Sequence, residues 1–153
     1  MRSQQETTVE RDEETLRIAI EMGKIFNDGD DEVARRLVAP DFIDYEAPEG
    51  TPGGPEGYAA TARYMRGVWT NARWDIVDAF AKGDKATLRV IFSGRHDSDF
   101  MGVAATGNEV RVQHIHIYRV SEGQVVEHWA VRDDLEVARQ IGAWTKPRAG
   151  GQR

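Results

Sequence analysis

The stretch VRVQHIHIYRV at residues 110–120 leads through the turn SEG at 121–123 into VVEHWAV at 125–131. Alternating apolar and polar side chains are typical of half-buried strands, and a Gly-containing turn between two such runs indicates a β-hairpin. Similar runs, separated by turns at 82–84 and 106–108, extend back to Trp74. We therefore predict a long series of antiparallel hairpins in the C-terminal half of the chain.

The N-terminal half instead has the three-and-four spacing of apolar residues that indicates helices. The expected helices cover residues 13–26, 31–39, 56–69 and, after the hairpins, 135–141, and a short strand covers 42–45. Helices segregated from hairpins favour an α+β fold over an alternating α/β fold. A strongly bent sheet wrapped against helices encloses a cavity or fills it, so a pocket is expected.

The chain has the size of one domain. Its 153 residues are enough to bury a core without a disulfide or a structural metal. We expect a single domain over 1–153, with an ordered core at about 13–143. The polar segments 1–11 and 145–153 offer little to bury, and we expect them to be flexible ends.

Composition argues against several classes of function. The absence of cysteine excludes disulfides, zinc–thiolate sites and a thiol nucleophile, and it fits a reducing compartment. A net charge of −6 without a basic cluster argues against nucleic acid as a partner. No apolar run approaches the roughly 20 residues that span a bilayer, and the start of the chain is acidic, unlike a signal peptide. We therefore expect a cytoplasmic protein with no membrane partner.

Three segments carry a resemblance to a known family: GPEGY at 54–58, GRHDSDFMGVAATG at 94–107 and IYRVSEGQVVEHWAVRDDLEVARQIG at 117–142. The matching positions in the last segment are Arg119, Gly123, Glu127, His128, Trp129, Asp133 and Gln140 to Gly142. Over about residues 13–143 the sequence resembles the SnoaL-like polyketide cyclases of the NTF2-like superfamily. The resemblance implies a cone-shaped α+β barrel. Its strongly curved antiparallel sheet would wrap against about three N-terminal helices, with a short C-terminal helix.

The resemblance also implies an activity. Cyclases of this kind close the last ring of an aromatic polyketide by an intramolecular aldol reaction, with no metal and no organic cofactor. An acidic residue takes a proton from carbon, and a nearby histidine stabilises the enolate. The family often has aspartate directly after the tryptophan, where this chain has Ala130. Three interpretations stay open: a cyclase-type enzyme, a non-catalytic small-molecule-binding module, and an enzyme with hydroxylation-assisting or hydrolytic activity.

His114 and His116 are the first catalytic candidates. Residues two apart on a strand share a face, and this face also carries Val110, Val112 and Tyr118, so we expect it to line the cavity. Burial disfavours the charged imidazolium and suits a neutral ring that polarises a substrate carbonyl. The alternative is that both are satisfied histidines of the core or of a dimer interface.

Asp133 is the remaining carboxylate candidate for proton abstraction, and alternatively it is the N-cap of the last helix. A metal site made of His114 and His116 with His128 or His96 is a further alternative. The family resemblance does not support that site, and we predict no metal and no cofactor.

Six residues are candidates for substrate binding: Tyr45, Tyr118, His128, Trp129, His96 and Asp44. Asp44 and Tyr45 are expected near the mouth of the cone, and His96 in a charged surface loop that could fold over the pocket. His128 and Trp129 point to opposite faces of one strand, and the register of the hairpin decides which of them enters the cavity. Trp129 is alternatively a core or interface residue.

The opposite face of the histidine strand carries Ile115 and Ile117. Exposed apolar patches of this kind usually mark an interface, so we expect a homodimer. The expected ligand is a hydrophobic small molecule, for which a polyketide is the leading candidate.

Overall fold

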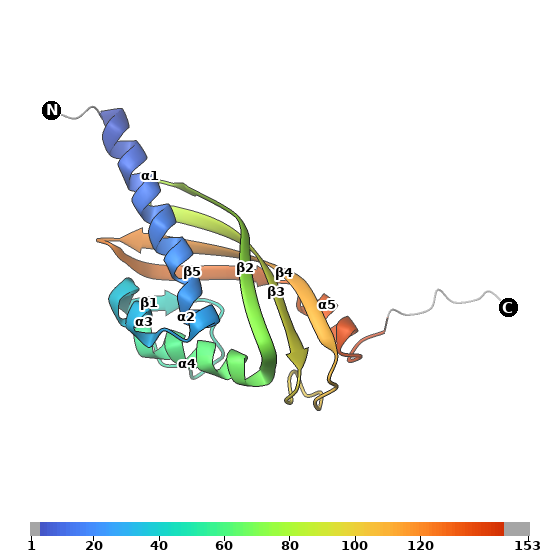
Figure 1. Cartoon of the computed structure of the whole chain (residues 1–153). Helices are drawn as coiled ribbons and strands as arrows, with labels where there is room; N and C mark the ends of the chain where they lie inside the picture. Colours follow the sequence, from blue (N-terminus) through green and yellow to red (C-terminus); the bar gives the residue numbers. More distant parts are fainter. Residues whose placement is uncertain (1–3, 146–153) are drawn as a thin grey trace.

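The computed structural model of the chain describes residues 4–145. Its helices are α1 (Gln4–Glu21), α2 (Gly23–Asp28), α3 (Asp31–Leu37), α4 (Gly54–Val68) and α5 (Asp134–Gln140). Its strands are β1 (Val38–Asp44), β2 (Trp69–Lys82), β3 (Lys85–His96), β4 (Glu109–Ser121) and β5 (Gln124–Arg132). The strands form one sheet in the order β1-β5-β4-β3-β2. Figure 1 shows this sheet bent around the N-terminal helices, with α5 apart from them, so the predicted α+β cone is confirmed.

Two expectations about the elements were wrong. The sheet is mixed rather than purely antiparallel, because the edge strand β1 runs parallel to β5. The first helix begins at Gln4, so the residues 4–11 that we interpreted as part of a flexible end are helical, with exposed side chains. Good helix formers such as Glu, Gln and Arg extend the helix there without an apolar face that would reveal it in the sequence. Residues 1–3 and 146–153 of the expected flexible ends lie outside the described residues.

Side chains of α1 and α2 hold these helices against the β2–β3 hairpin. The Gly83 backbone N–H donates to Asp12 Oδ1 at 2.6 Å, and Thr15 Oγ1 donates to the Gly83 carbonyl at 2.8 Å. The Asn27 amide pairs with both the N–H and the carbonyl of Trp74, each at 2.9 Å. These bonds satisfy backbone groups of Gly83 in the turn and of Trp74 on the edge strand β2.

A one-residue bulge in β5 sets the register of the central hairpin. Glu122 and Gly123 both have positive φ, 50° and 77°, as a tight two-residue hairpin turn requires. Next to that turn Val120 pairs with Val125, but Arg119 then pairs with Glu127, so Val126 is the extra residue. Beyond the bulge His128 lies opposite Tyr118, and Ala130 lies opposite His116. Residues opposite each other share a face, so His128 points inward and Trp129 points outward.

The core lies between the inner face of the sheet and the helices. Buried apolar side chains from both layers include Ile18, Ile25, Leu37, Phe42, Tyr58, Trp69, Leu88, Phe92, Val112 and Ile141. The inward positions of β3 are buried at every second residue from Ala86 to His96, as the predicted alternation requires. Among residues 4–145, none of the helices combines the length and the apolar character of a membrane span.

Two glycines of α4 provide a matched test of packing. A Cβ at Gly57 would lie 1.6 Å from the Pro52 carbonyl oxygen, whereas a Cβ at Gly67 would meet nothing within 4 Å. We expect Gly57→Ala to lower the free energy of unfolding by about 1–3 kcal/mol through overpacking. We expect Gly67→Ala to raise it by up to about 1 kcal/mol, because alanine restricts the unfolded chain and favours the helix. Urea unfolding measures both changes, and effects of the same sign would contradict this packing.

Candidate active site

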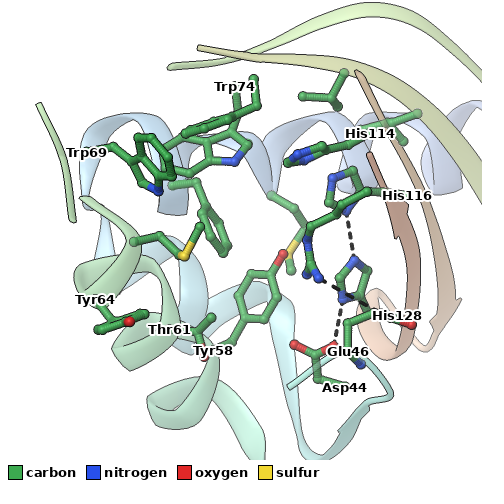
Figure 2. Close-up of a pocket in the computed structure, with 18 of the residues that line it drawn as sticks. Asp44, Glu46, Tyr58, Thr61, Tyr64, Trp69, Trp74, His114, His116 and His128 are labelled. Atoms are coloured by element: carbon green, nitrogen blue, oxygen red, sulfur yellow. Dashed lines mark hydrogen bonds and ion pairs between the residues drawn. The ribbon is translucent and has the colours of Figure 1, made fainter. Parts of the chain in front are cut away.

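A cavity of about 310 Å³ opens between the helices and the inner face of the sheet. This volume is at the lower end of the range of small-molecule pockets. Its apolar lining includes Met22, Phe26, Met65, Trp69, Trp74, Leu88, Val90, Phe92 and Phe100. Its polar lining includes Asp44, Glu46, Tyr58, His114, His116, Tyr118, His128 and Arg132. Figure 2 shows aromatic rings along one side and the three histidines with Asp44 along the other.

His114, His116 and Tyr118 alternate along β4 and all line the cavity, as the spacing predicted. His114 packs its ring parallel to Phe92, with 5.6 Å between the ring centroids. Burial, together with the charge of Arg132, lowers the pKa of His114 to about 4. Burial, followed by the charges of His128, His114 and Arg132, lowers the pKa of His116 well below its ordinary value. Both imidazoles are therefore neutral at pH 7.

His116, His128 and Asp44 form a continuous chain of hydrogen bonds. Nδ1 of His116 lies 2.9 Å from Nε2 of His128, and Nδ1 of His128 lies 2.9 Å from Oδ1 of Asp44. Burial alone would raise the pKa of Asp44, but its hydrogen bond to His128 and the nearby positive charges outweigh this and lower it. The chain thus links an ionised carboxylate to an imidazole at the cavity wall (Figure 2).

The parallel pairing of β1 with β5 places Asp44 beside His128. Asp44 and His128 are partners in the register, and the Tyr45 N–H donates to the His128 carbonyl at 3.1 Å. Asp44 therefore lines the cavity as expected, while the next residue, Tyr45, points away from it. Tyr45 stacks on Trp129, with 5.2 Å between the ring centroids, and its hydroxyl donates to Glu127. Neither Tyr45 nor Trp129, both expected to bind substrate, lines the cavity.

Two buried phenols close the polar side of the cavity. The hydroxyl oxygens of Tyr58 and Tyr118 lie 2.9 Å apart, and the ring of Tyr118 stacks on His128. Burial raises the pKa of Tyr118 to about 12 and that of Tyr58 well above its ordinary value. Both hydroxyls stay protonated at neutral pH and orient the polar cluster. Tyr58 ends the GPEGY segment and was not among the candidate site residues.

Arg132 and Glu46 are cavity residues that the sequence analysis missed. Arg132 lies opposite His114 in the strand register, and its Nη1 is 3.9 Å from Glu46 Oε2. A count by twos from His128 places Arg132 on the same face of β5 and could have found it. Glu46 follows the end of β1 and carries no such pattern. Arg132 brings a positive charge to the cavity wall, where it can stabilise a developing oxyanion.

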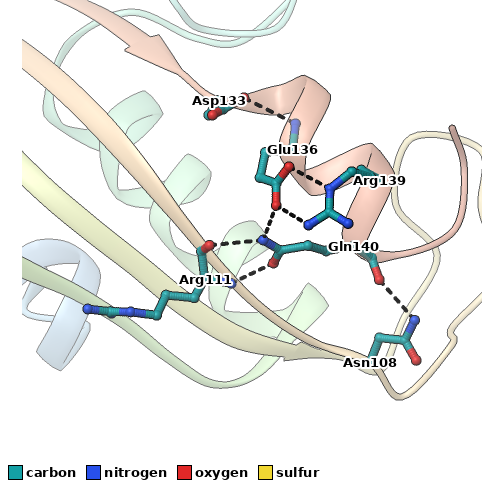
Figure 3. Close-up of polar contacts among 6 residues, drawn as sticks. All are labelled: Asn108, Arg111, Asp133, Glu136, Arg139 and Gln140. Atoms are coloured by element: carbon teal, nitrogen blue, oxygen red, sulfur yellow. Dashed lines mark hydrogen bonds and ion pairs between the residues drawn. The ribbon is translucent and has the colours of Figure 1, made fainter. Parts of the chain in front are cut away.

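Asp133 lies outside the cavity lining, in an exposed position. Its carboxylate accepts from the Glu136 N–H at 3.1 Å and caps α5, which is the alternative left open for it. Figure 3 shows how α5 is then attached to β4. The side-chain amide of Gln140 pairs with both backbone groups of Arg111, at 2.8 and 3.1 Å. Asp133 and Gln140, which carry part of the family resemblance, thus have structural roles here.

His96 is buried rather than in a surface loop, so that expectation was wrong. It ends β3 with none of its surface exposed, because the following loop folds back on it. Its backbone N–H donates to Asn108 O at 2.9 Å, and its Nδ1 lies 2.9 Å from Thr106 Oγ1. The ring packs against Trp69, which lines the cavity, but His96 itself does not.

No metal site emerges from the described residues. Within residues 4–145 there is no group of three or more His, Asp or Glu side chains with the geometry to hold a metal ion. The imidazoles of His116 and His128 are hydrogen-bonded to each other, and His96 lies outside the cavity. The residues that line the cavity offer acid–base groups and hydrogen-bond donors.

Comparisons with known proteins agree with this architecture. A family described as SnoaL-like polyketide cyclase matches residues 17–141. The aklanonic acid methyl ester cyclase DnrD of Streptomyces peucetius is 25% identical over 130 residues, covering 82% of this chain and 90% of that protein. The nogalonic acid methyl ester cyclase of Streptomyces nogalater is 24% identical over 123 residues, covering 79% and 92%. The structure of TsrD from Streptomyces laurentii superposes with a TM-score of 0.78 at 26% identity, covering 86% and 96%.

A bent sheet that closes on helices around one pocket, with titratable groups on the inner face of its central strands, defines the class of NTF2-like α+β cones. Within that class the match extends over most of the chain. The chain belongs to the SnoaL-like polyketide cyclase family.

The lowered pKa of His114 predicts a pH dependence of stability. In the unfolded chain this histidine titrates near 6.5, so between pH 6.5 and about 4 the unfolded state binds a proton that the folded state rejects. The free energy of unfolding then falls as the pH falls, with up to about 1.4 kcal/mol per pH unit from this residue. In His114→Phe we expect a shallower slope in urea unfolding at pH 7, 6 and 5. Identical slopes in the two proteins would contradict the burial of a neutral imidazole.

Proposed function

We propose that this chain is an enzyme that performs acid–base chemistry on a hydrophobic, carbonyl-bearing small molecule, without a cofactor. The favoured reaction is an intramolecular aldol ring closure of a polyketide intermediate. The observation that carries the proposal is the position of His116 in an apolar cavity, hydrogen-bonded through His128 to Asp44. The methyl ester cyclases among its relatives support a polyketide ester as the substrate class.

His116 is the proposed acid–base group. Its Nε2 makes no hydrogen bond within residues 4–145 and is not sealed in the protein interior, so it is free to meet a ligand in the cavity. The base takes a proton from the carbon next to one carbonyl, and the enolate carbon forms a bond with a second carbonyl carbon of the same molecule. The alkoxide that results takes up the proton. Apolar walls hold the two reacting carbons close together and exclude water.

His114 is the proposed hydrogen-bond donor to the enolate oxygen. Its Nδ1 is sealed and has no partner among the described residues, whereas its Nε2 is open. A buried N–H without an acceptor is rarer in proteins than an unpaired acceptor, so the single proton belongs on Nε2. A fixed donor in a dry site stabilises charge that develops during the reaction. The guanidinium of Arg132, opposite His114, adds a positive charge on the same side.

The role of His116 has a direct test with aklanonic acid methyl ester as substrate. We expect His116→Ala to lower turnover by about 100-fold or more, the usual scale for one acid–base group. Trp129→Phe, on the outer face of the neighbouring strand, is the matched control and should leave turnover near the wild-type value. Chromatography with mass detection follows the cyclised product. A fully active His116→Ala protein would reject this role.

Ala130 favours one competing function, a non-catalytic binding module. It lies opposite His116, where many family members have aspartate, and it offers no functional group. In an otherwise competent site, Ala130→Asp should raise ring closure by adding a carboxylate beside His116. A binding module would take up the ester and release it unchanged in both proteins. Product mass separates the remaining alternatives, because ring closure leaves the mass unchanged unless water is lost, whereas hydrolysis and hydroxylation change it.

We also propose that the chain forms a homodimer through the outer face of β4 and β5. Ile115 pairs with Val131 and Ile117 pairs with Trp129, so the four make a contiguous apolar surface. Val131 is 74% exposed in the single chain. An exposed apolar patch of this kind is typical of a protein–protein interface. Sedimentation at micromolar concentration should give a dimer, and Val131→Asp should shift it to a monomer. A wild-type monomer would contradict this interface.

A further inference from the structure

We infer that Asp44, acting through His128, fixes the tautomer of His116 so that Nε2 of His116 faces the cavity as an unprotonated base. This arrangement would replace the carboxylate that is absent at Ala130. The inference deepens the proposed function and rests on it, since it concerns the same reaction, but it is a statement about ring protons that needs no substrate to test.

The first step concerns the bond between Asp44 and His128. An ionised carboxylate only accepts hydrogen bonds, so the Nδ1 of His128, 2.9 Å from Asp44 Oδ1, must carry a proton. The same oxygen accepts from the Glu46 N–H at 3.0 Å, which fixes the carboxylate in place. The His128 side chain is 2% exposed, so water does not compete for this contact. As a neutral ring, His128 is therefore held as the Nδ1–H tautomer.

The second step carries this constraint to His116. A neutral imidazole has one N–H, so Nε2 of His128 is left with a lone pair. Nδ1 of His116 lies 2.9 Å from that nitrogen, and the planes of the two rings differ by 11°, which suits an N–H···N bond in the ring plane. Nδ1 of His116 must then be the donor. The remaining nitrogen of His116, Nε2, is consequently the lone pair that faces the cavity.

The third step explains how a buried imidazole can serve as a base. Burial opposes a positive charge on His116. When its Nε2 takes a proton from carbon, its Nδ1 proton can pass to Nε2 of His128 along the existing hydrogen bond. One proton enters His116 and one leaves it, and the positive charge comes to rest on His128, against the carboxylate of Asp44. Asp44 and His128 are thus positioning residues, which act on the substrate through His116.

Nitrogen NMR of the uniformly labelled full chain, without substrate, tests the assignment. Long-range correlations within each ring distinguish protonated from unprotonated ring nitrogens. We expect a protonated Nδ1 and an unprotonated Nε2 for His116, and a protonated Nδ1 with an unprotonated Nε2 for His128. A protonated Nε2 on His116 in the wild-type protein at pH 7 would overturn the inference, whatever the protein catalyses.

Two substitutions of Asp44 separate the tautomer from the charge. Asp44→Leu removes the acceptor, so His116 should show a mixture of tautomers. Asp44→Asn keeps an oxygen that can accept from both His128 and Glu46, so the spectrum of His116 should stay as in the wild type. Without the negative charge of Asp44, turnover should still fall about 100-fold, the scale for losing one electrostatic contact to a developing charge. Asp133→Asn, at the exposed cap of α5, is the control and should change neither readout.

The outcomes also distinguish this inference from the proposed function. Should no polyketide ester be cyclised while the nitrogen spectra show the expected tautomers, the proposed substrate is wrong and the proton arrangement stands. An active enzyme whose His116 tautomer is the same in wild type and Asp44→Leu would refute the inference and leave the proposed function intact. If the leucine variant does not fold, the nitrogen spectra of the wild-type protein still decide the inference, because a protonated Nε2 on His116 overturns it.

Discussion

The inserted residue Val126 decides which side chains of β5 meet the cavity. Strand pairing from the turn at 122–123 without this bulge would place Glu127 opposite Tyr118 and Trp129 opposite His116. The carboxylate of Glu127 and the indole of Trp129 would then face inward, and His128 would lie on the outer face. With the bulge, His128 stands between His116 and Asp44, and the indole is on the outside against Tyr45. The polar side of the cavity depends on this local change of register.

The parallel docking of β1 supplies the other half of the site. The chain passes from α3 directly into β1, which lies at the sheet edge beside β5. This position brings the last residue of the strand, Asp44, to His128 across 84 positions of sequence. The helix α4 packs against β1 (Figure 1), and the Asp44 side chain is only 12% exposed although it lies on an edge strand. A carboxylate in this setting stays ionised because it has a hydrogen-bonded imidazole and a backbone donor.

Local patterns predicted much of this structure. The alternation along residues 110–120 placed His114, His116 and Tyr118 on the inner face, and the turn residues located the β2–β3 and β4–β5 hairpins. Asp133 was recognisable as a possible helix cap, and its side chain accepts from the Glu136 amide as an N-cap does; Asp30 caps α3 in the same way. Arg132 was predictable by the same period of two and was overlooked beside the more conspicuous Asp133.

Other features have no local signal. The tight turn at 122–123 and the inward position of His128 are compatible only because β5 contains one extra residue, Val126. Valine is common in regular strands, so the sequence gives no sign of this bulge. The middle of α1 is held by bonds from Asp12 and Thr15 to a turn far along the chain. His96 is buried because the loop around Thr106 folds back onto it. The charged residues next to His96 in the sequence instead indicated a surface position.

The edge position of β1 has a consequence for how the cluster of Asp44, His128 and His116 is assembled during folding. Hairpins between β2, β3 and β4 bring together residues that are close in sequence, and they assemble His114 and His116 on one surface without any carboxylate. Contacts across long sequence separations are entropically the most demanding to form. Asp44 joins the cluster when the edge strand β1 pairs with its neighbour β5. The hydrogen-bonded chain from Asp44 through His128 to His116 is therefore complete only when β1 is paired with β5.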